Sequence, residues 1–202
     1  MTTGPGTVSK ILWHFTGGPS CGQSHRKAPE DAYAALRSIL ESCELRVSYE
    51  PQLIKQRRSA PDFVTVQKQE TARVACVAEI PIQHLDHHAR VYGEFAIGFH
   101  RSAALEAGFR PVIYALVDDW TIKQLMDGGD EKLLSLVKTF DQSEFETTYA
   151  EREWRCRQAF RFELSQVAML VLPREYRARL IEDIQRQSHE VPIIAYEDLL
   201  QH

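Results

Sequence analysis

Hydrophobic residues occur in short runs along this chain, and seven of these runs predict β-strands. Turn-forming residues end several of the runs: Gly17, Gly18 and Pro19 follow the first, and Pro81 follows the third. Short apolar runs that glycine or proline terminates are typical of strands buried in a sheet. We therefore predict strands over residues 11–16, 45–48, 74–80, 94–99, 111–117, 164–172 and 191–195.

A spacing of three or four residues between apolar positions predicts helices elsewhere in the chain. In residues 29–42, Ala32, Leu36 and Leu40 share one face, and Pro29 suits the first helical turn. Further helices are expected over residues 82–91, 101–107, 118–142 and 173–187. Because strands and helices do not alternate regularly, the pattern favours an α+β fold with a mixed, mostly antiparallel sheet and flanking helices. We expect a flexible leader over residues 1–10 and one domain over residues 11–202.

Composition narrows the class of protein. The chain has 202 residues, 44% of them hydrophobic, which is enough for a core, and its net charge of −4 gives no general attraction to nucleic acid. Residues 46–73 are locally basic and include Lys55, Arg57 and Arg58, and we expect a solvated loop there, with phosphate contacts as the alternative. The chain opens with polar residues and has no apolar run of about 18 residues, so we expect a cytoplasmic protein without a membrane span.

A pair of closely spaced carboxylates, Glu151 and Glu153, is the first candidate for chemistry. In an extended strand, side chains two residues apart point to the same face, about 7 Å from each other. Such a pair can polarise a sugar hydroxyl or stabilise a developing positive charge. The alternative is a solvated charge run on a helix, where residues two apart do not share a face.

Histidine and tyrosine side chains form the second candidate. His14 and Thr16 lie at the end of the first predicted strand and would share a face if their neighbours point to the core. His84, His88 and Tyr92 have the four-residue spacing of one helix face, where the tyrosine could stack on a flat heterocycle. A buried, hydrogen-bonded histidine is the alternative for His14. No further ligand of the expected spacing supports a metal site, so we predict none.

Three sequence blocks, in this order, resemble a bacterial family of abortive-infection proteins of the AbiGi type. They are the opening Trp13-His14-Phe15-Thr16, a middle block with Cys76 through Pro81 and His88 through Phe99, and the late Glu151-Arg152-Glu153-Trp154-Arg155. The resemblance extends over about residues 11–175. The order His, Tyr, Glu is also similar to that of the ADP-ribosyltransferase superfamily, although the middle strand lacks the Ser-Thr-Ser of transferases that modify arginine.

The resemblance implies a phage-defence protein of a toxin–antitoxin pair, with NAD as substrate if it is a transferase. Glu153 would then stabilise the ribosyl cation and Glu151 would orient the acceptor, a protein or a nucleic acid. Tyr92 would stack on the nicotinamide. The cofactor-binding residues would be His14, Thr16, His88 and Arg155, the last of them at the pyrophosphate.

Two other functions stay open. The chain could be a non-catalytic antitoxin or protein-binding module whose partner is its cognate toxin, and its charged residues would then form structural ion pairs. A nuclease with His14, His88 and Glu153 as its acid, base and metal groups is the third hypothesis. The sequence leaves the roles of His84 and His87 undecided.

Overall fold

A computed structural model describes residues 9–19, 25–49, 51–60, 63–144, 148–184 and 191–200. The side chains of residues 58–60 and 63–64 are not described, and most of the predicted leader lies outside the described residues. The chain forms two compact units, which are treated separately below. Unit 1 comprises residues 1–45, 77–108 and 160–202, and unit 2 comprises residues 46–76 and 109–159.

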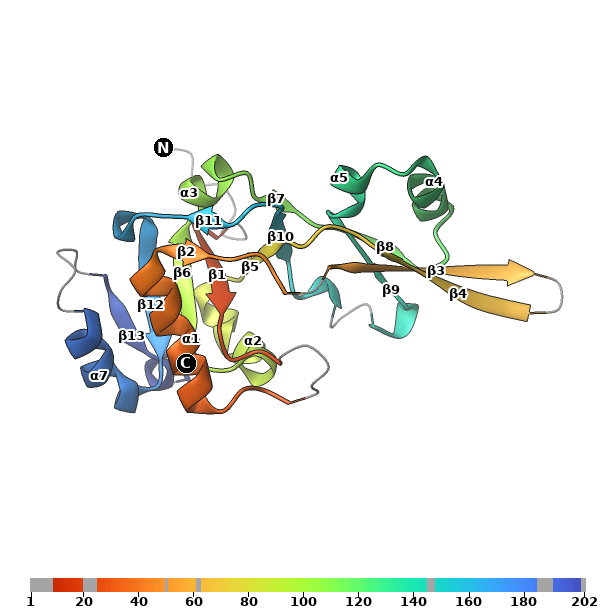
Figure 1. Cartoon of the computed structure of the whole chain (residues 1–202). Helices are drawn as coiled ribbons and strands as arrows, with labels where there is room; N and C mark the ends of the chain where they lie inside the picture. Colours follow the sequence, from red (N-terminus) through yellow and green to blue (C-terminus); the bar gives the residue numbers. More distant parts are fainter. Residues whose placement is uncertain are drawn as a thin grey trace, which may run out of the picture. The chain divides into compact units, whose positions relative to one another are not determined.

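Unit 1 is organised around a sheet with the strand order β13-β12-β6-β1-β5 (Figure 1). Its strands are β1 (Ile11–Phe15), β5 (Ala75–Ala78, of which the first two residues belong to unit 2), β6 (Ala96–His100), β12 (Val167–Leu172) and β13 (Ile193–Ala195). All neighbours in this order are antiparallel except β12 and β13, which run parallel. The prediction of an α+β fold with a mixed, mostly antiparallel sheet is confirmed.

Helices accompany this sheet in unit 1. The α-helices are α1 (Pro29–Ser42), α2 (Leu85–Tyr92), α3 (Arg101–Glu106) and α7 (Arg174–Ile184). The short elements are β2 (Glu44–Leu45), which pairs with β11 (Phe160–Arg161), and the 3-10 helices η1 (Ile82–His84), η3 (Leu164–Gln166) and η4 (Tyr196–Leu200). Helix α1 has the bounds that the sequence predicts, because its apolar spacing and its Pro29 mark both the buried face and the first turn.

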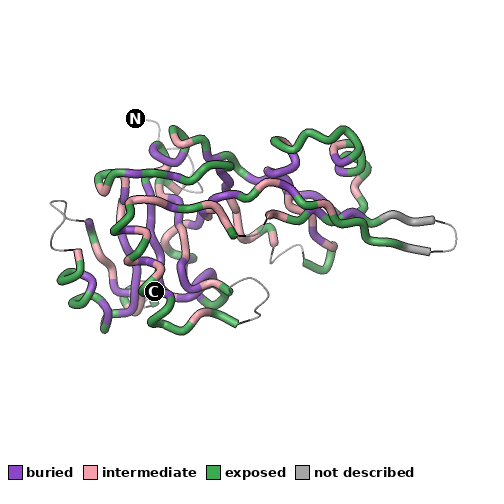
Figure 2. The backbone as a smooth tube through the Cα atoms, in the orientation of Figure 1, coloured by how far each residue is buried: buried purple, intermediate pink, exposed green. Residues whose placement is uncertain are grey.

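Much of the central sheet of unit 1 is buried (Figure 2). Its core is built around Trp13 in β1, whose side chain is almost fully buried. The indole Nε1 donates a hydrogen bond of 3.0 Å to the carbonyl of Ile80. Across the sheet, Trp13 lies opposite Gly98 in β6, where an added Cβ would come within 2.8 Å of the indole ring. Gly98 therefore provides the space that the tryptophan occupies.

Unit 2 contains a long β-hairpin and a smaller parallel pair. The hairpin consists of β3 (Leu53–Ala60) and β4 (Phe63–Glu70), which pair along their whole length. The other elements are β7 (Arg110–Pro111), β8 (Ile113–Leu116), α4 (Trp120–Gly128), α5 (Glu131–Leu134), β9 (Val137–Phe140), η2 (Gln142–Glu144) and β10 (Glu153–Cys156). Strands β8 and β9 are parallel, and β10 and β7 are antiparallel. A small core of this unit includes Ile54, Ile122, Met126, Leu134 and Val137.

One prediction for unit 2 is wrong, and another is confirmed in part. The hairpin lies where the sequence predicts a solvated loop; among the described side chains of β3 only Ile54 and Gln56 are buried, which gives little apolar signal. Residues 118–142 were predicted as mostly helical, and α4 and α5 confirm this, whereas β9 is extended because it pairs with β8. The strand predicted over residues 45–48 is the shorter β2. In the described part of the chain, no helix combines the length and apolar character that a membrane crossing requires.

Candidate functional site

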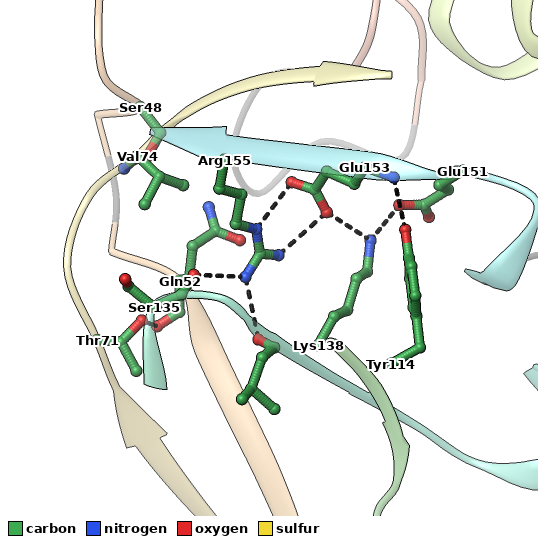
Figure 3. Close-up of polar contacts among 11 residues, drawn as sticks. Ser48, Gln52, Thr71, Val74, Tyr114, Ser135, Lys138, Glu151, Glu153 and Arg155 are labelled. Carbon is green, nitrogen blue, oxygen red and sulfur yellow. Dashed lines mark hydrogen bonds and ion pairs between the residues drawn. The ribbon is translucent and has the colours of Figure 1, made fainter. Parts of the chain in front are cut away.

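The late charged segment forms a buried ion pair in unit 2. Glu153 and Arg155 lie two residues apart on β10, so both side chains leave the strand on the same face. Arg155 Nε donates to Glu153 Oε1 at 3.0 Å, and Nη2 donates to Oε2 at 3.1 Å (Figure 3). The Arg155 side chain is only 3% exposed. A two-point guanidinium–carboxylate pair of this kind is both strong and geometrically specific.

The remaining donors of Arg155 bind backbone carbonyls. Its Nη1 donates to Ser135 O at 3.1 Å and to Val137 O at 3.0 Å. The two carbonyls lie at the end of α5 and the start of β9. Arg155 therefore connects β10 to the segment that leads into β9, and the contact satisfies carbonyls that would otherwise be buried without a donor.

Lys138 in β9 brings the two predicted carboxylates together. Its ammonium forms an ion pair with Glu151 and lies 3.5 Å from Glu153 Oε2 (Figure 3). Glu151, however, precedes β10, so the prediction that both carboxylates lie on one strand is wrong. Arg152 between them has a left-handed backbone with φ of 43°, which interrupts the extended chain. The carboxylates approach each other because they share a lysine.

The surroundings of Glu153 hold it in its charged form. Burial alone would raise the pKa of Glu153, but the charges of Arg155 and Lys138 and hydrogen bonds from Arg155 and Cys76 outweigh burial and lower this pKa. Burial and the neighbouring Glu153 raise the pKa of the Cys76 thiol, which stays protonated and donates to the carboxylate. The backbone N–H of Glu153 donates to the Tyr114 hydroxyl at 2.7 Å. Glu153 is therefore an ionised acceptor whose two oxygens already have donors.

These contacts favour a structural role for the pair. The predicted role of Glu153, stabilising a ribosyl cation, needs an ionised carboxylate, but both of its oxygens are already bound by Arg155, and one of them also lies beside Lys138. A pyrophosphate ligand would have to compete with Glu153 and two carbonyls for the guanidinium of Arg155. In unit 2, these contacts hold β10 to β9 through ion pairs and hydrogen bonds. Sequence reasoning did not identify Lys138 and Tyr114, because both lie far from the late segment along the chain.

In unit 1, the predicted aromatic residues form a cluster. The ring of Phe15 lies 5.5 Å from that of His88 and 6.2 Å from that of Tyr92, and the His88 and Tyr92 rings are 5.2 Å apart. His88 is buried and Tyr92 is half-buried. The predicted contact between these two residues on one helix face is therefore present in α2. His84 is exposed and lies before the helix, outside this cluster.

Thr16 has a structural contact of its own. It follows β1 and is buried, and its hydroxyl donates to Ala32 O in α1 at 2.8 Å. This bond attaches the end of β1 to the first turns of α1. His14 is half-buried within β1, and the shared face of His14 and Thr16 stays a prediction.

A cavity of about 570 Å³ lies in unit 1, near the ends of β1 and α2. Three of its lining residues, Arg26, Lys27 and Arg90, are cationic. The first two also donate to backbone carbonyls, Arg26 to Ala89 O and Lys27 to Thr16 O, both at 3.1 Å. No local sequence pattern indicates this cavity, because its basic residues come from two segments more than sixty residues apart.

The predicted site residues thus divide between the two units. His14, Thr16, His88 and Tyr92 belong to unit 1, whereas Glu151, Glu153 and Arg155 belong to unit 2. Within each unit, most of these residues lie close to one another. Among the described residues, no group of three histidine, cysteine or acidic side chains is placed to hold a metal ion.

These features define an α+β protein in which a buried ion-pair network occupies the late charged segment of the sequence. A family model described as "Putative abortive phage resistance protein AbiGi, antitoxin" matches residues 53–186. The match covers more than half of the chain, and the chain belongs to this family. No curated protein and no solved structure matches the chain.

The family assignment confirms the AbiGi part of the resemblance. The middle block and the Glu151–Arg155 block lie inside the matched range, and the opening block with His14 lies outside it. The similarity to ADP-ribosyltransferases gains no support from this match.

Proposed function

We propose that this protein is the antitoxin of a phage-defence pair and acts in the cytoplasm by binding its cognate toxin. The observation that carries the proposal is the family match over residues 53–186, whose description names an antitoxin. The matched range includes all of the hairpin and the whole of residues 109–159, and therefore nearly all of unit 2. We accordingly assign toxin binding to unit 2.

The distribution of exposed apolar side chains supports this assignment. Of the eleven large hydrophobic residues that are exposed in the described part of the chain, seven belong to unit 2, although it has fewer than half of the residues. These seven are Tyr49, Leu53, Val66, Ile113, Leu116, Trp120 and Tyr149. Protein-binding surfaces are enriched in aromatic residues, and Trp and Tyr often contribute most of the binding energy.

The ion-pair network also fits a binding protein better than an enzyme. Glu153, the first choice for a catalytic carboxylate, is held by Arg155, Lys138 and Cys76. A network of this kind gives a binding unit a fixed shape, which lowers the entropy that association must overcome.

Co-expression with a toxin tests the proposal. The candidate toxin is the protein encoded next to this chain in its own genome, expressed in bacteria from a separately inducible promoter. We expect the toxin alone to stop growth, this chain alone to be harmless, and both together to grow and to copurify as a complex. Growth arrest by this chain alone, or a toxin that it neither binds nor neutralises, would contradict the proposal.

An NAD-binding pocket is a second candidate, which the cavity in unit 1 favours. The cavity presents Arg26, Lys27 and Arg90, cations that suit phosphate groups, together with the acidic Glu94. Tyr92 does not line the cavity itself but stands between the lining residues Val91 and Gly93. Under this hypothesis the tyrosine stacks on the nicotinamide and NAD is the substrate of a transferase.

Thermal unfolding with and without NAD tests this second candidate. NAD at about 100 times its dissociation constant stabilises a protein by roughly 2.7 kcal/mol, which raises Tm by several degrees in a chain of this size. We expect the shift to disappear in Tyr92→Ala and to persist in Tyr149→Ala, a matched change in unit 2. An unchanged Tm with NAD would reject the pocket and leave the antitoxin proposal unaffected.

A further inference from the structure

The outer strand of the hairpin in unit 2 has an open edge. On the inner side, β3 is attached to the rest of the unit, because Arg57 N donates to Val117 O at 2.7 Å and Lys55 N donates to Thr139 Oγ1 at 2.8 Å. Strand β4 pairs only with β3 among the described strands, and the hairpin extends past β8 and β9 (Figure 1). The outer edge of β4 thus presents backbone N–H and C=O groups that can pair with another chain.

Two lysines lie directly opposite each other on one face of this hairpin. The strand register pairs Lys55 with Lys68, and both side chains are exposed. Among the described residues neither ammonium has a carboxylate partner, whereas Arg57 on the same face is paired with Asp141. Like charges directly opposite each other destabilise a sheet. The hairpin therefore tolerates an unfavourable contact on what we call the lysine face.

Apolar side chains flank the two lysines. Leu53 and Val66 lie on the same face, because they occupy the neighbouring registers of the alternating strands. They are 50% and 51% exposed. Lysines alone are a common protection of an edge strand against self-association. That protection does not require an opposed lysine pair between two half-exposed apolar residues. The apolar residues offer a partner surface to bury, and the lysines offer it charges to complement.

We propose that the lysine face and the open edge of β4 bind an acidic, extended segment of the toxin. This inference rests on the proposed antitoxin function and names the surface and the chemistry of the partner. A strand added to β4 lies about 4.8 Å from it and places carboxylates beside Lys68, in the field of Lys55. Because the opposed lysines repel a basic strand and gain no attraction from an uncharged one, the same charges select an acidic strand.

The hairpin fits a protein partner better than a nucleic acid. The open strand edge offers main-chain pairing that only another polypeptide can use. Leu53 and Val66 contribute apolar surface, which a polypeptide partner can cover. The chain as a whole has a net charge of −4, which opposes general binding to nucleic acid.

Charge reversal tests the proposal on the full-length protein. The probe is the purified toxin from the co-expression experiment, and the readout is its dissociation constant for wild type, Lys55→Glu, Lys68→Glu and the control Lys10→Glu. Lys10 is an exposed lysine of unit 1, to which we assign no toxin contact. We expect both hairpin variants to bind about tenfold more weakly or worse, and the control to bind as wild type does.

Stability and salt separate a binding role from a structural one. Each single reversal places opposite charges across the strands, so the hairpin variants should unfold at the same temperature as wild type or higher. Raising NaCl from about 50 to about 300 mM should weaken wild-type binding more than that of the variants, because it screens the lost attraction.

Each outcome has a distinct meaning. A toxin that wild type does not bind overturns the proposed function and this inference with it. Toxin binding that the hairpin variants retain in full overturns the inference alone. Binding of a duplex DNA of about 20 base pairs that the hairpin variants lose, with toxin binding retained, would assign the lysine face to nucleic acid instead.

Discussion

Glu153 and Arg155 stand two residues apart on β10 and hold each other through two hydrogen bonds, of 3.0 and 3.1 Å. The same arginine donates to two backbone carbonyls, and the same glutamate lies beside Lys138. A charged segment that suggests catalysis from its spacing is thus a set of mutually satisfied charges. The stability of the protein should therefore depend on the charge of Glu153.

Removing the charge of Glu153 is expected to destabilise the protein. Glu153→Gln keeps the size of the side chain but leaves the buried Arg155 guanidinium without its counter-ion. Breaking one partner of a buried ion pair costs about 3–5 kcal/mol of unfolding free energy. Urea unfolding measures this loss, with Glu70→Gln as a control at an exposed position of the same unit. A Glu153→Gln protein as stable as wild type would contradict the structural role.

The contribution of Glu153 to stability is expected to depend on pH in one direction. Its pKa is lower in the folded protein than the ordinary value of 4.5, so the folded state favours the ionised carboxylate. The stabilisation is then fully present above the ordinary pKa and is lost as pH falls through the lowered one. The difference in unfolding free energy between wild type and Glu153→Gln should be constant near neutral pH and shrink below pH 4.5. A difference that grows on acidification would contradict the lowered pKa.

Gly98 is expected to tolerate no side chain. An added Cβ would lie 2.7 Å from Ile11 Cγ2 and 2.8 Å from the Trp13 ring, so Gly98→Ala must displace the central tryptophan. Overpacking of this kind costs about 1–3 kcal/mol, which lowers Tm by several degrees. Gly128→Ala on α4 is the control, because nothing lies within 4 Å of its added Cβ. We expect Gly128→Ala to keep or slightly raise Tm in differential scanning calorimetry.

Trp120 is expected to contribute to toxin binding. Its side chain is 68% exposed at the start of α4, in the unit to which we assign the interaction. Trp120→Ala should raise the dissociation constant for the toxin about tenfold or more, because buried aromatic anchors carry much of the energy of protein interfaces. Ile181→Ala, which removes an exposed apolar residue from unit 1, should leave the dissociation constant unchanged. Equal losses in both variants would contradict the assignment to unit 2.

The sequence by itself determined the helices and strands whose buried side chains repeat at regular intervals along the chain. Helix α1 was predicted with its observed bounds, and the strands β1, β5, β6 and β12 lie within or close to their apolar runs. In these elements local spacing and burial agree, because the buried face repeats with the period of the element. That Glu153 and Arg155 lie on one face also follows from local sequence, since a strand points residues two apart to the same side.

Only the tertiary structure decided the remaining features. The hairpin has few buried side chains and β9 is short, so their extended form depends on pairing with other strands, which local sequence does not specify. Lys138 reaches Glu151 and Glu153 because the fold places β9 beside β10, a contact that no spacing along the chain reveals. The charges of the late segment were visible in the sequence. Whether they face a ligand or one another depended on long-range packing, which closes the ion pairs inside unit 2.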